Sequence, residues 1–103
     1  MNQYTKIKVR AAIRQLKIDL GCAMCQEHDP IVLEYHHIQP KEHSMSMSQV
    51  TRKASSINKI RAELELCVIL CANCHLRAHA GIFNPADLHS IKLLENWPYI
   101  TEE

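Results

Sequence analysis

The sequence predicts a small α+β domain with two short strands, a helix at each end and a thin hydrophobic core. The chain has 103 residues, which is the length of a single domain. Its apolar residues follow helical spacing in some segments and form short β-branched runs in others. The chain has only one Phe, one Trp and three Tyr, so few large aromatic side chains can anchor the core. We therefore expect one domain over residues 1–103 that needs an additional stabilising device.

The composition excludes several classes of protein. The chain is 47% hydrophobic and 22% charged, which is typical of a globular domain and not of a disordered one. No apolar run reaches the roughly 18 residues of a membrane span, and Met1–Leu20 lacks the uncharged core of a signal peptide. We therefore expect a cytoplasmic protein with no membrane partner. Two glycines are too few for a Gly-rich phosphate loop.

The net charge is only +1, but the charges are unevenly distributed. Residues 1–61 hold ten basic and five acidic side chains, whereas residues 62–103 hold two basic and six acidic ones. A basic half can face a polyanion although the whole chain is nearly neutral. A solvated surface with a chance asymmetry explains the same distribution equally well.

The first expected element is a basic amphipathic helix within residues 1–20. Apolar side chains recur on one face at helical spacing: Val9, Ile13, Leu16 and Leu20. A second stripe beside it is basic: Lys6, Arg10, Arg14 and Lys17. Gly21 is expected to end this helix. The basic stripe either follows a phosphate backbone or is simply the solvated side of a surface helix.

A strand is expected next, over Ile31–Ile38, where β-branched and aromatic residues lie between two prolines. Residues 39–56 are polar and lack clear periodicity, so a long loop is expected there. Helical spacing then returns over a short stretch: Ile57, Ile60 and Leu64.

The second half should contain a strand and two helices. Cys67–Leu70 is a short apolar run that predicts a strand, and a helix is expected from Ala72 to Ala80, with Gly81 as its stop. Residues 84–97 predict a last helix, capped at its start by an Asn-Pro pair. Four apolar side chains of this helix should point inward: Leu88, Ile91, Leu94 and Trp97.

The most specific motif is a pair of C-x-x-C sequences: Cys22-Ala23-Met24-Cys25 and Cys71-Ala72-Asn73-Cys74. Each tight knuckle aims two sulfurs at one ion, so together they predict a tetrahedral structural zinc site. Disulfides fit a cytosolic chain poorly, and a redox pair would explain only one of the two motifs. Zinc would fold residues 26–70 back on themselves. Cys67, the fifth cysteine, is expected to be a small buried hydrophobe.

Four histidines are placed to form a second metal site. His75 and His79 lie four apart on one helical face, so both imidazoles can reach one ion. His36 and His37 end the first strand, and adjacent strand residues point to opposite sides. One of them can complete a three-histidine site, which leaves the other free beside the ion. A free imidazole there can take a proton from water while the cation stabilises charge on a phosphate.

These motifs, in their order along the chain, resemble those of the HNH nucleases. The matching segments are Leu33-Glu34-Tyr35-His36-His37-Ile38-Gln39-Pro40, Glu65-Leu66-Cys67-Val68-Ile69-Leu70-Cys71-Ala72-Asn73-Cys74-His75 and His79. They are similar to the small zinc-bearing branch that is common in phages and bacteria. The resemblance implies a ββα-metal (His-Me finger) fold, with residues 21–80 as its zinc-stapled core. By the same resemblance, His37 matches the general base, and the ligands of the catalytic divalent cation are His36, His75 and His79.

The sequence departs from the commoner HNH pattern at one position. Leu66 replaces the middle Asn of that pattern, and Asn73 is the candidate for bracing the loop that carries His37. Basic side chains of the long loop and of nearby helices are candidates for a nucleic-acid surface: Lys41, Arg52, Lys53 and Arg77.

The expected activity is therefore metal-dependent hydrolysis of DNA phosphodiester bonds. Three imidazole ligands favour Zn²⁺, Mn²⁺, Ni²⁺ or Co²⁺ over Mg²⁺, although availability in the cell could decide for Mg²⁺. A monomer would nick one strand, whereas double-strand cleavage would need a homodimer or two successive events. RNA remains a second candidate substrate. The alternative class is a catalytically silent, zinc-stabilised module that binds DNA or another protein.

Overall fold

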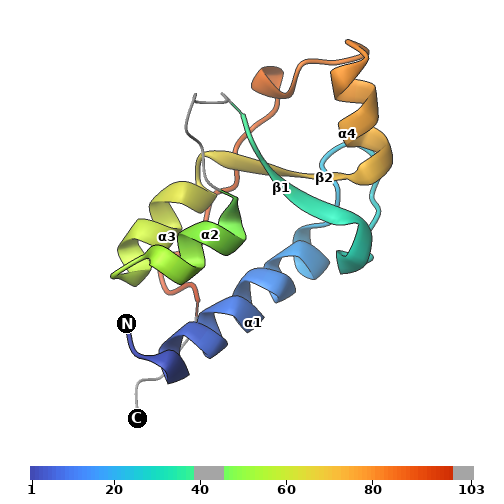
Figure 1. Cartoon of the computed structure of the whole chain (residues 1–103). Coiled ribbons are helices and arrows are strands. Elements are labelled where there is room, and N and C mark those ends of the chain that lie inside the picture. Colours follow the sequence, from blue (N-terminus) through green and yellow to red (C-terminus); the bar gives the residue numbers. More distant parts are fainter. Residues whose placement is uncertain (39–45, 99–103) are drawn as a thin grey trace.

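The computed structural model describes residues 1–38 and 46–98 of the chain (Figure 1). Within these residues it shows a two-stranded antiparallel sheet and four α-helices, so the predicted small α+β class is confirmed. The elements are α1 (Gln3–Leu20), η1 (Pro30–Val32), β1 (Leu33–His37), α2 (Met47–Lys53), α3 (Ile57–Leu64), β2 (Cys67–Cys71), α4 (Ala72–His79) and η2 (Pro85–Asp87), where η denotes a 3-10 helix.

Helix α1 forms where the sequence predicts it, and local hydrogen bonds set its ends. The Asn2 side chain accepts a hydrogen bond from the amide three residues further on, at 2.8 Å. At the other end Gly21 has a φ of 69°, a left-handed conformation that favours glycine. Of the predicted apolar stripe, Val9 and Ile13 are buried, whereas Leu20 is 51% exposed. Leu16 is partly buried against the core, so Leu20 alone of the predicted stripe lies outside it.

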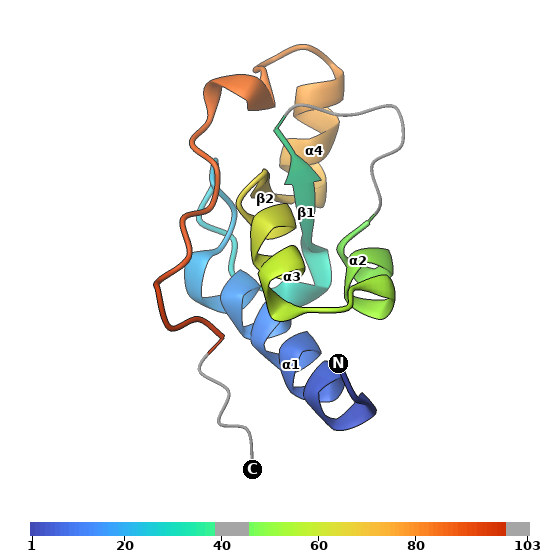
Figure 2. The same cartoon turned by 90° about the vertical axis from the view of Figure 1, so that its left-hand side faces the viewer.

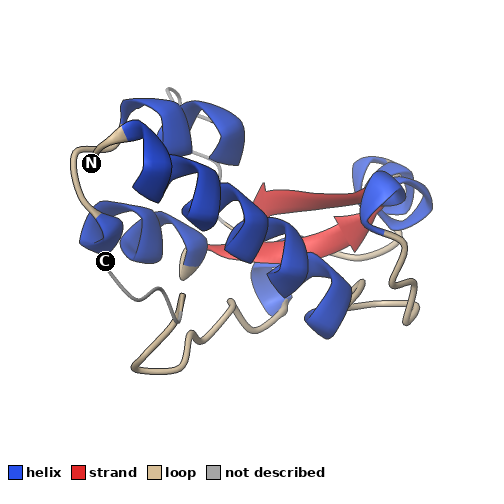
Figure 3. Ribbon diagram, turned by 90° about the horizontal axis from the view of Figure 1, so that it is seen from below, coloured by secondary structure: helices blue, strands red, loops and turns tan. Residues whose placement is uncertain are grey.

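The two strands pair in antiparallel register, with Leu33 opposite Cys71 and His37 opposite Cys67. Every residue of β2 is buried, whereas Leu33 is the only fully buried residue of β1. Helix α4 continues directly from β2 at one end of the sheet, and α2 and α3 lie toward the other end (Figures 1 and 3). The two ends of the sheet therefore have different helical neighbours.

The long loop expected over residues 39–56 is interrupted by a helix. Residues 39–45 lie outside the described part of the chain, but Met47–Lys53 form α2. A capping box starts this helix, because Ser46 and Gln49 exchange side chain–backbone hydrogen bonds at 3.2 and 3.1 Å. The loop prediction is therefore wrong for this segment.

The buried face of α2 explains why its periodicity is hard to recognise. Met47, Val50 and Thr51 are all buried, and one of them is polar. The Thr51 hydroxyl donates a hydrogen bond to the Met47 carbonyl at 2.8 Å, which satisfies it inside the core. A pattern that counts only apolar residues misses this position.

The helix expected over residues 84–97 is not formed. Asn84 accepts a hydrogen bond from the amide two residues on, but it caps only the single turn Pro85–Asp87. Beyond this turn the chain runs without regular structure down one side of the molecule (Figure 2). Asn84 therefore acts as a cap as predicted, but no helix continues beyond Asp87.

Long-range hydrogen bonds hold this C-terminal segment instead. The Ile91 amide donates to the Cys67 carbonyl at 2.9 Å, and the Arg61 guanidinium donates to the carbonyls of Leu94 and Trp97. Ile91 and Trp97 are buried as expected, whereas Leu94 is 66% exposed. Of these groups a helix ending at residue 97 would need only the Ile91 amide, because the last four carbonyls of a helix have no partner within it. The bond to Cys67 takes this donor, so a tertiary contact overrides local propensity there.

Candidate metal centres and the histidine site

Two segments that are distant in the sequence bring four cysteines together. Cys22 and Cys25 follow α1, while Cys71 ends β2 and Cys74 lies in the first turn of α4. Their Sγ atoms all lie within 4.8 Å of one another. Sulfurs bound to one zinc ion at about 2.3 Å in tetrahedral geometry are about 3.8 Å apart, so the cluster has the size of a zinc site. The predicted zinc ligands therefore form a candidate structural metal site.

Backbone amides and one guanidinium donate hydrogen bonds to sulfurs of this cluster. Burial raises the pKa of the Cys22 thiol, but amide hydrogen bonds from Cys71 and Met24 outweigh it and lower the pKa to about 7. Burial raises the pKa of Cys74 to about 12, although Arg77 donates to its sulfur at 3.4 Å. A divalent cation bound here would displace the remaining thiol protons.

The backbone holds the first knuckle in place. The Ala23 amide donates to the Ile69 carbonyl of β2 at 2.9 Å. A Cβ on Gly21 would lie only 2.7 Å from Cε1 of His28, so this position accepts no larger residue without a shift. His28 in turn donates from Nδ1 to the Ile18 carbonyl at 2.6 Å. This histidine therefore helps to close the loop and lies outside the cysteine cluster.

His75 and His79 face each other across one turn of α4. Their Nε2 atoms are 3.1 Å apart. Two nitrogens bound to one tetrahedral ion at about 2.0–2.1 Å are about 3.3 Å apart, so this pair has the spacing of two ligands. The other nitrogen of His75, Nδ1, lies 3.3 Å from Oε2 of Glu34. A carboxylate that accepts from Nδ1–H leaves the Nε2 lone pair free for a cation, as is usual for metal-binding histidines.

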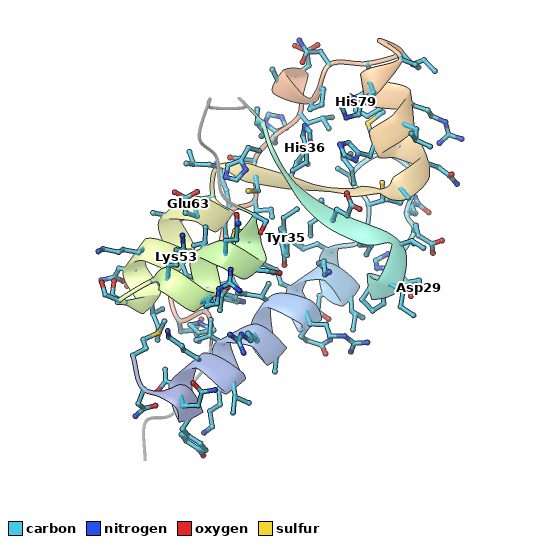
Figure 4. The ribbon with its side chains drawn as sticks, viewed as in Figure 1. Asp29, Tyr35, His36, Lys53, Glu63 and His79 are labelled. Atoms are coloured by element: carbon cyan, nitrogen blue, oxygen red, sulfur yellow. The ribbon has the colours of Figure 1, made fainter. Side chains whose placement is uncertain are left out.

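His36 is the neighbour of this pair on β1. Its ring lies edge-on to that of His75, with 5.0 Å between the ring centroids, and Figure 4 shows it on the α4 side of the sheet. Burial, together with the charges of His75 and His79, lowers the pKa of His36, which favours the neutral ring that metal binding requires. Among the described residues, only the four cysteines bring three or more donor atoms within 4.8 Å of one another. His36 is therefore adjacent to the pair without closing a compact three-ligand set.

His37 has its hydrogen-bond partner on a different helix from this pair. Its Nε2 atom lies 3.1 Å from Oε2 of Glu63 in α3. The His37 side chain is 14% exposed and borders an open hollow of about 400 Å³, together with Ile38, Leu66 and His89. The imidazole is therefore anchored by a carboxylate and still lies next to open space.

The predicted nucleic-acid residues that the structure describes lie on two separate helices. Arg52 and Lys53 are exposed at the end of α2. Arg77 belongs to α4, which lies at the other end of the sheet (Figure 1). Its guanidinium donates to the Cys74 sulfur at 3.4 Å. Lys41 lies outside the described residues.

Sequence reasoning did not single out the carboxylates that contact the histidines. Asn73, the candidate brace, is exposed on the first turn of α4, and the partner of His37 is Glu63. Glu34 was also missed, although its position two residues before His36 puts it on the same side of β1. No comparable signal marks Glu63, because a separate helix brings it to the strand.

Comparison with models of protein families, with curated proteins and with solved structures gave no match to this chain. The functional assignment therefore depends on the residues and their geometry. None of the helices within residues 1–38 and 46–98 has both the length and the apolar character needed to cross a bilayer.

Proposed function

We propose that this protein is a metal-dependent endonuclease of the HNH type that hydrolyses DNA phosphodiester bonds. The observation that carries the proposal is the 3.1 Å spacing of the His75 and His79 nitrogens, beside the ring of His36 and with Glu34 on the outer nitrogen of His75. This arrangement supports a catalytic cation held by His36, His75 and His79. The motif order along the chain and the cysteine cluster support the same assignment.

Within this proposal His37 is the general base. The Glu63 carboxylate accepts a hydrogen bond from Nε2–H, so Nδ1 carries the lone pair that takes a proton from water. The same carboxylate stabilises the imidazolium that then forms, as the buried aspartate does in a Ser-His-Asp triad. The open hollow beside His37 gives water and a phosphodiester room to approach.

A divalent cation at the three imidazoles would supply electrostatic stabilisation of the charge on the phosphate and on the departing oxygen. Zn²⁺, Mn²⁺, Ni²⁺ and Co²⁺ suit these ligands better than Mg²⁺. DNA is the proposed partner and RNA the second candidate. One centre per chain would nick one strand, and double-strand cleavage would need two copies or two events. Four zinc-binding thiols suit a reducing compartment, so we place the protein in the cytoplasm.

A catalytically silent module that binds DNA or another protein is the second candidate function. The cysteine cluster would stabilise such a module equally well. The histidines favour the enzyme, because a binding module needs neither a His37–Glu63 pair beside an open hollow nor a pair of imidazoles at ligand spacing.

A plasmid-nicking assay separates the two candidates. Zinc-loaded protein is incubated with supercoiled DNA and each of the five cations in turn, in parallel with the His37→Ala variant. We expect nicking by the unmodified protein and a loss of about 10²- to 10⁴-fold in the variant. Metal content and circular dichroism serve as controls for folding. Equal nicking by both proteins would contradict the role of His37, and no nicking with any cation would favour the silent module.

A further inference from the structure

A basic hollow of about 460 Å³ opens between α1 and α2, and none of the described histidines lines it. Its basic lining residues come from both helices: Arg10, Arg14, Lys17 and Arg52. No carboxylate within residues 1–38 and 46–98 lines it. We refer to this hollow and these four side chains as the basic hollow. Such a concentration of one charge attracts anions, because low-dielectric walls focus the field.

The spacing of the α1 residues suits a repeating anion. Arg10, Arg14 and Lys17 follow one another at intervals of four and three, so they form one stripe along the helix. The stripe spans about 10 Å at 1.5 Å per residue. One strand of duplex DNA carries a phosphate about every 3.4 Å along its axis, so the stripe can face about three consecutive phosphates.

Three of the four cationic groups have no partner within the part of the chain that the structure describes. Among the described residues, no hydrogen bond or ion pair involves the guanidinium groups of Arg10, Arg14 or Arg52. Lys17 differs, because its Nζ donates to the Leu33 carbonyl at 3.2 Å and lies 5.9 Å from the centre of the Tyr35 ring. The lysine therefore helps to hold the hollow together, while the three arginine side chains make no such contact with a described residue.

Hydrogen bonds fix the walls of the basic hollow. Tyr35 lines the hollow, and its hydroxyl donates to the Ile13 carbonyl at 2.6 Å, which joins β1 to α1. The Lys6 ammonium donates to the Arg52 carbonyl at 2.6 Å, which joins α1 to α2. The arginines are therefore mounted on connected elements and not on a single free helix.

We propose that the basic hollow binds the phosphodiester backbone of duplex DNA next to the cleavage site. The proposal rests on the endonuclease assignment for the identity of the polyanion. Tyr35 and His37 are two residues apart on the same side of β1, so their Cα atoms are about 7 Å apart along the strand. A backbone in the hollow therefore passes close to the end of β1, where the general base lies.

The test measures binding without cleavage. All variants carry His37→Ala, and their affinity for a labelled DNA duplex is measured by fluorescence anisotropy between about 50 and 200 mM salt. The test variant combines Arg10→Gln, Arg14→Gln and Arg52→Gln, which leaves the structural Lys17 in place. The matched control combines three substitutions of basic residues outside the hollow: Lys8→Gln, Lys59→Gln and Lys92→Gln.

We expect the test variant to bind DNA more weakly and to lose about 2–3 units from the slope of log affinity against log salt. The control should keep most of the affinity and slope, because its net charge changes equally but its lysines lie elsewhere. Equal losses in both variants, no loss in the test variant, or no binding by the parent protein would each overturn the proposal. If the test variant alone loses binding but the unmodified protein does not nick DNA in the plasmid assay, only the enzymatic assignment is refuted.

Discussion

His37 and Glu63 form a hydrogen-bonded pair across the boundary between the sheet and α3, with 3.1 Å between Nε2 and Oε2. The glutamate belongs to the last turn of α3, and its own carbonyl accepts a hydrogen bond from Cys67 Sγ at 3.3 Å. Cys67 lies opposite His37 in the strand register. The sheet therefore holds both partners, and the carboxylate determines which ring nitrogen of His37 carries the proton.

Replacing Glu63 by alanine should leave the His37 ring free to rotate and to carry its proton on either nitrogen. Under the proposed function, nicking should fall about 10- to 100-fold, the range seen when a carboxylate that orients an imidazole is lost. Glu63→Gln keeps an acceptor for Nε2–H and should retain more activity than Glu63→Ala. Zinc content should be unchanged in both variants.

The position of the proton can be measured independently of catalysis. The ¹⁵N chemical shifts of the His37 ring, recorded at alkaline pH, should show the proton on Nε2 in the unmodified protein and in Glu63→Gln. Glu63→Ala should show a mixture of the two tautomers. Asn58→Ala, an exposed change on the same helix, is the control. An alanine variant with unchanged tautomer and unchanged nicking would show that Glu63 does not position His37.

Removing the metal from the cysteine cluster should unfold much of the domain. Zinc binding by a structural site contributes on the order of 10 kcal/mol in apparent free energy, which is as large as the stability of a typical domain. A chelator should therefore abolish the native circular dichroism, and Cys74→Ser should fold poorly even with zinc present. Cys67→Ala is the matched control, because Cys67 is buried outside the cluster. Native dichroism in excess chelator would show that the fold does not depend on the metal.

Cys67 should resist alkylation in the folded protein. Burial raises the pKa of its thiol from 9.0 to about 12, and the thiolate is the reactive form. The pKa of this thiol is higher in the folded protein than in the unfolded one. The stability that the buried neutral thiol contributes is therefore fully present below pH 9 and is lost as the pH rises toward 12. Peptide mapping after iodoacetamide treatment at neutral pH should find Cys67 unmodified until denaturant is added. Rapid modification under native conditions would contradict its burial.

The parts of the site that depend on local geometry can be predicted from the sequence. In a C-x-x-C knuckle, four consecutive residues are enough to direct two sulfurs at one ion. His75 and His79 come together because of helical spacing alone. The partner of His37 depends instead on where α3 packs against β2. No pattern within one segment contains that information, so Glu63 emerges only from the structure.

The errors in the predicted fold have a similar origin. Helix α2 is missed because the buried Thr51 interrupts its apolar pattern and satisfies its hydroxyl within the helix. The C-terminal segment has a helical pattern and a good cap, but Arg61 and the Cys67 carbonyl engage its backbone from outside. The conformation of this segment depends on competition between local and long-range hydrogen bonds. The sequence pattern indicates only the local ones.

Glu34 provides a test of the second metal site that leaves every proposed ligand in place. Glu34→Ala removes the carboxylate 3.3 Å from Nδ1 of His75, so the affinity for a second cation should fall about 10- to 100-fold. Calorimetric titration of zinc-loaded protein with Ni²⁺ or Mn²⁺ measures this affinity, and the exposed change Glu95→Ala is the control. The zinc content of the cysteine cluster should stay constant throughout. Unchanged affinity in Glu34→Ala would show that the carboxylate does not orient His75, whereas a parent protein that binds only one ion per chain would refute the three-histidine site itself.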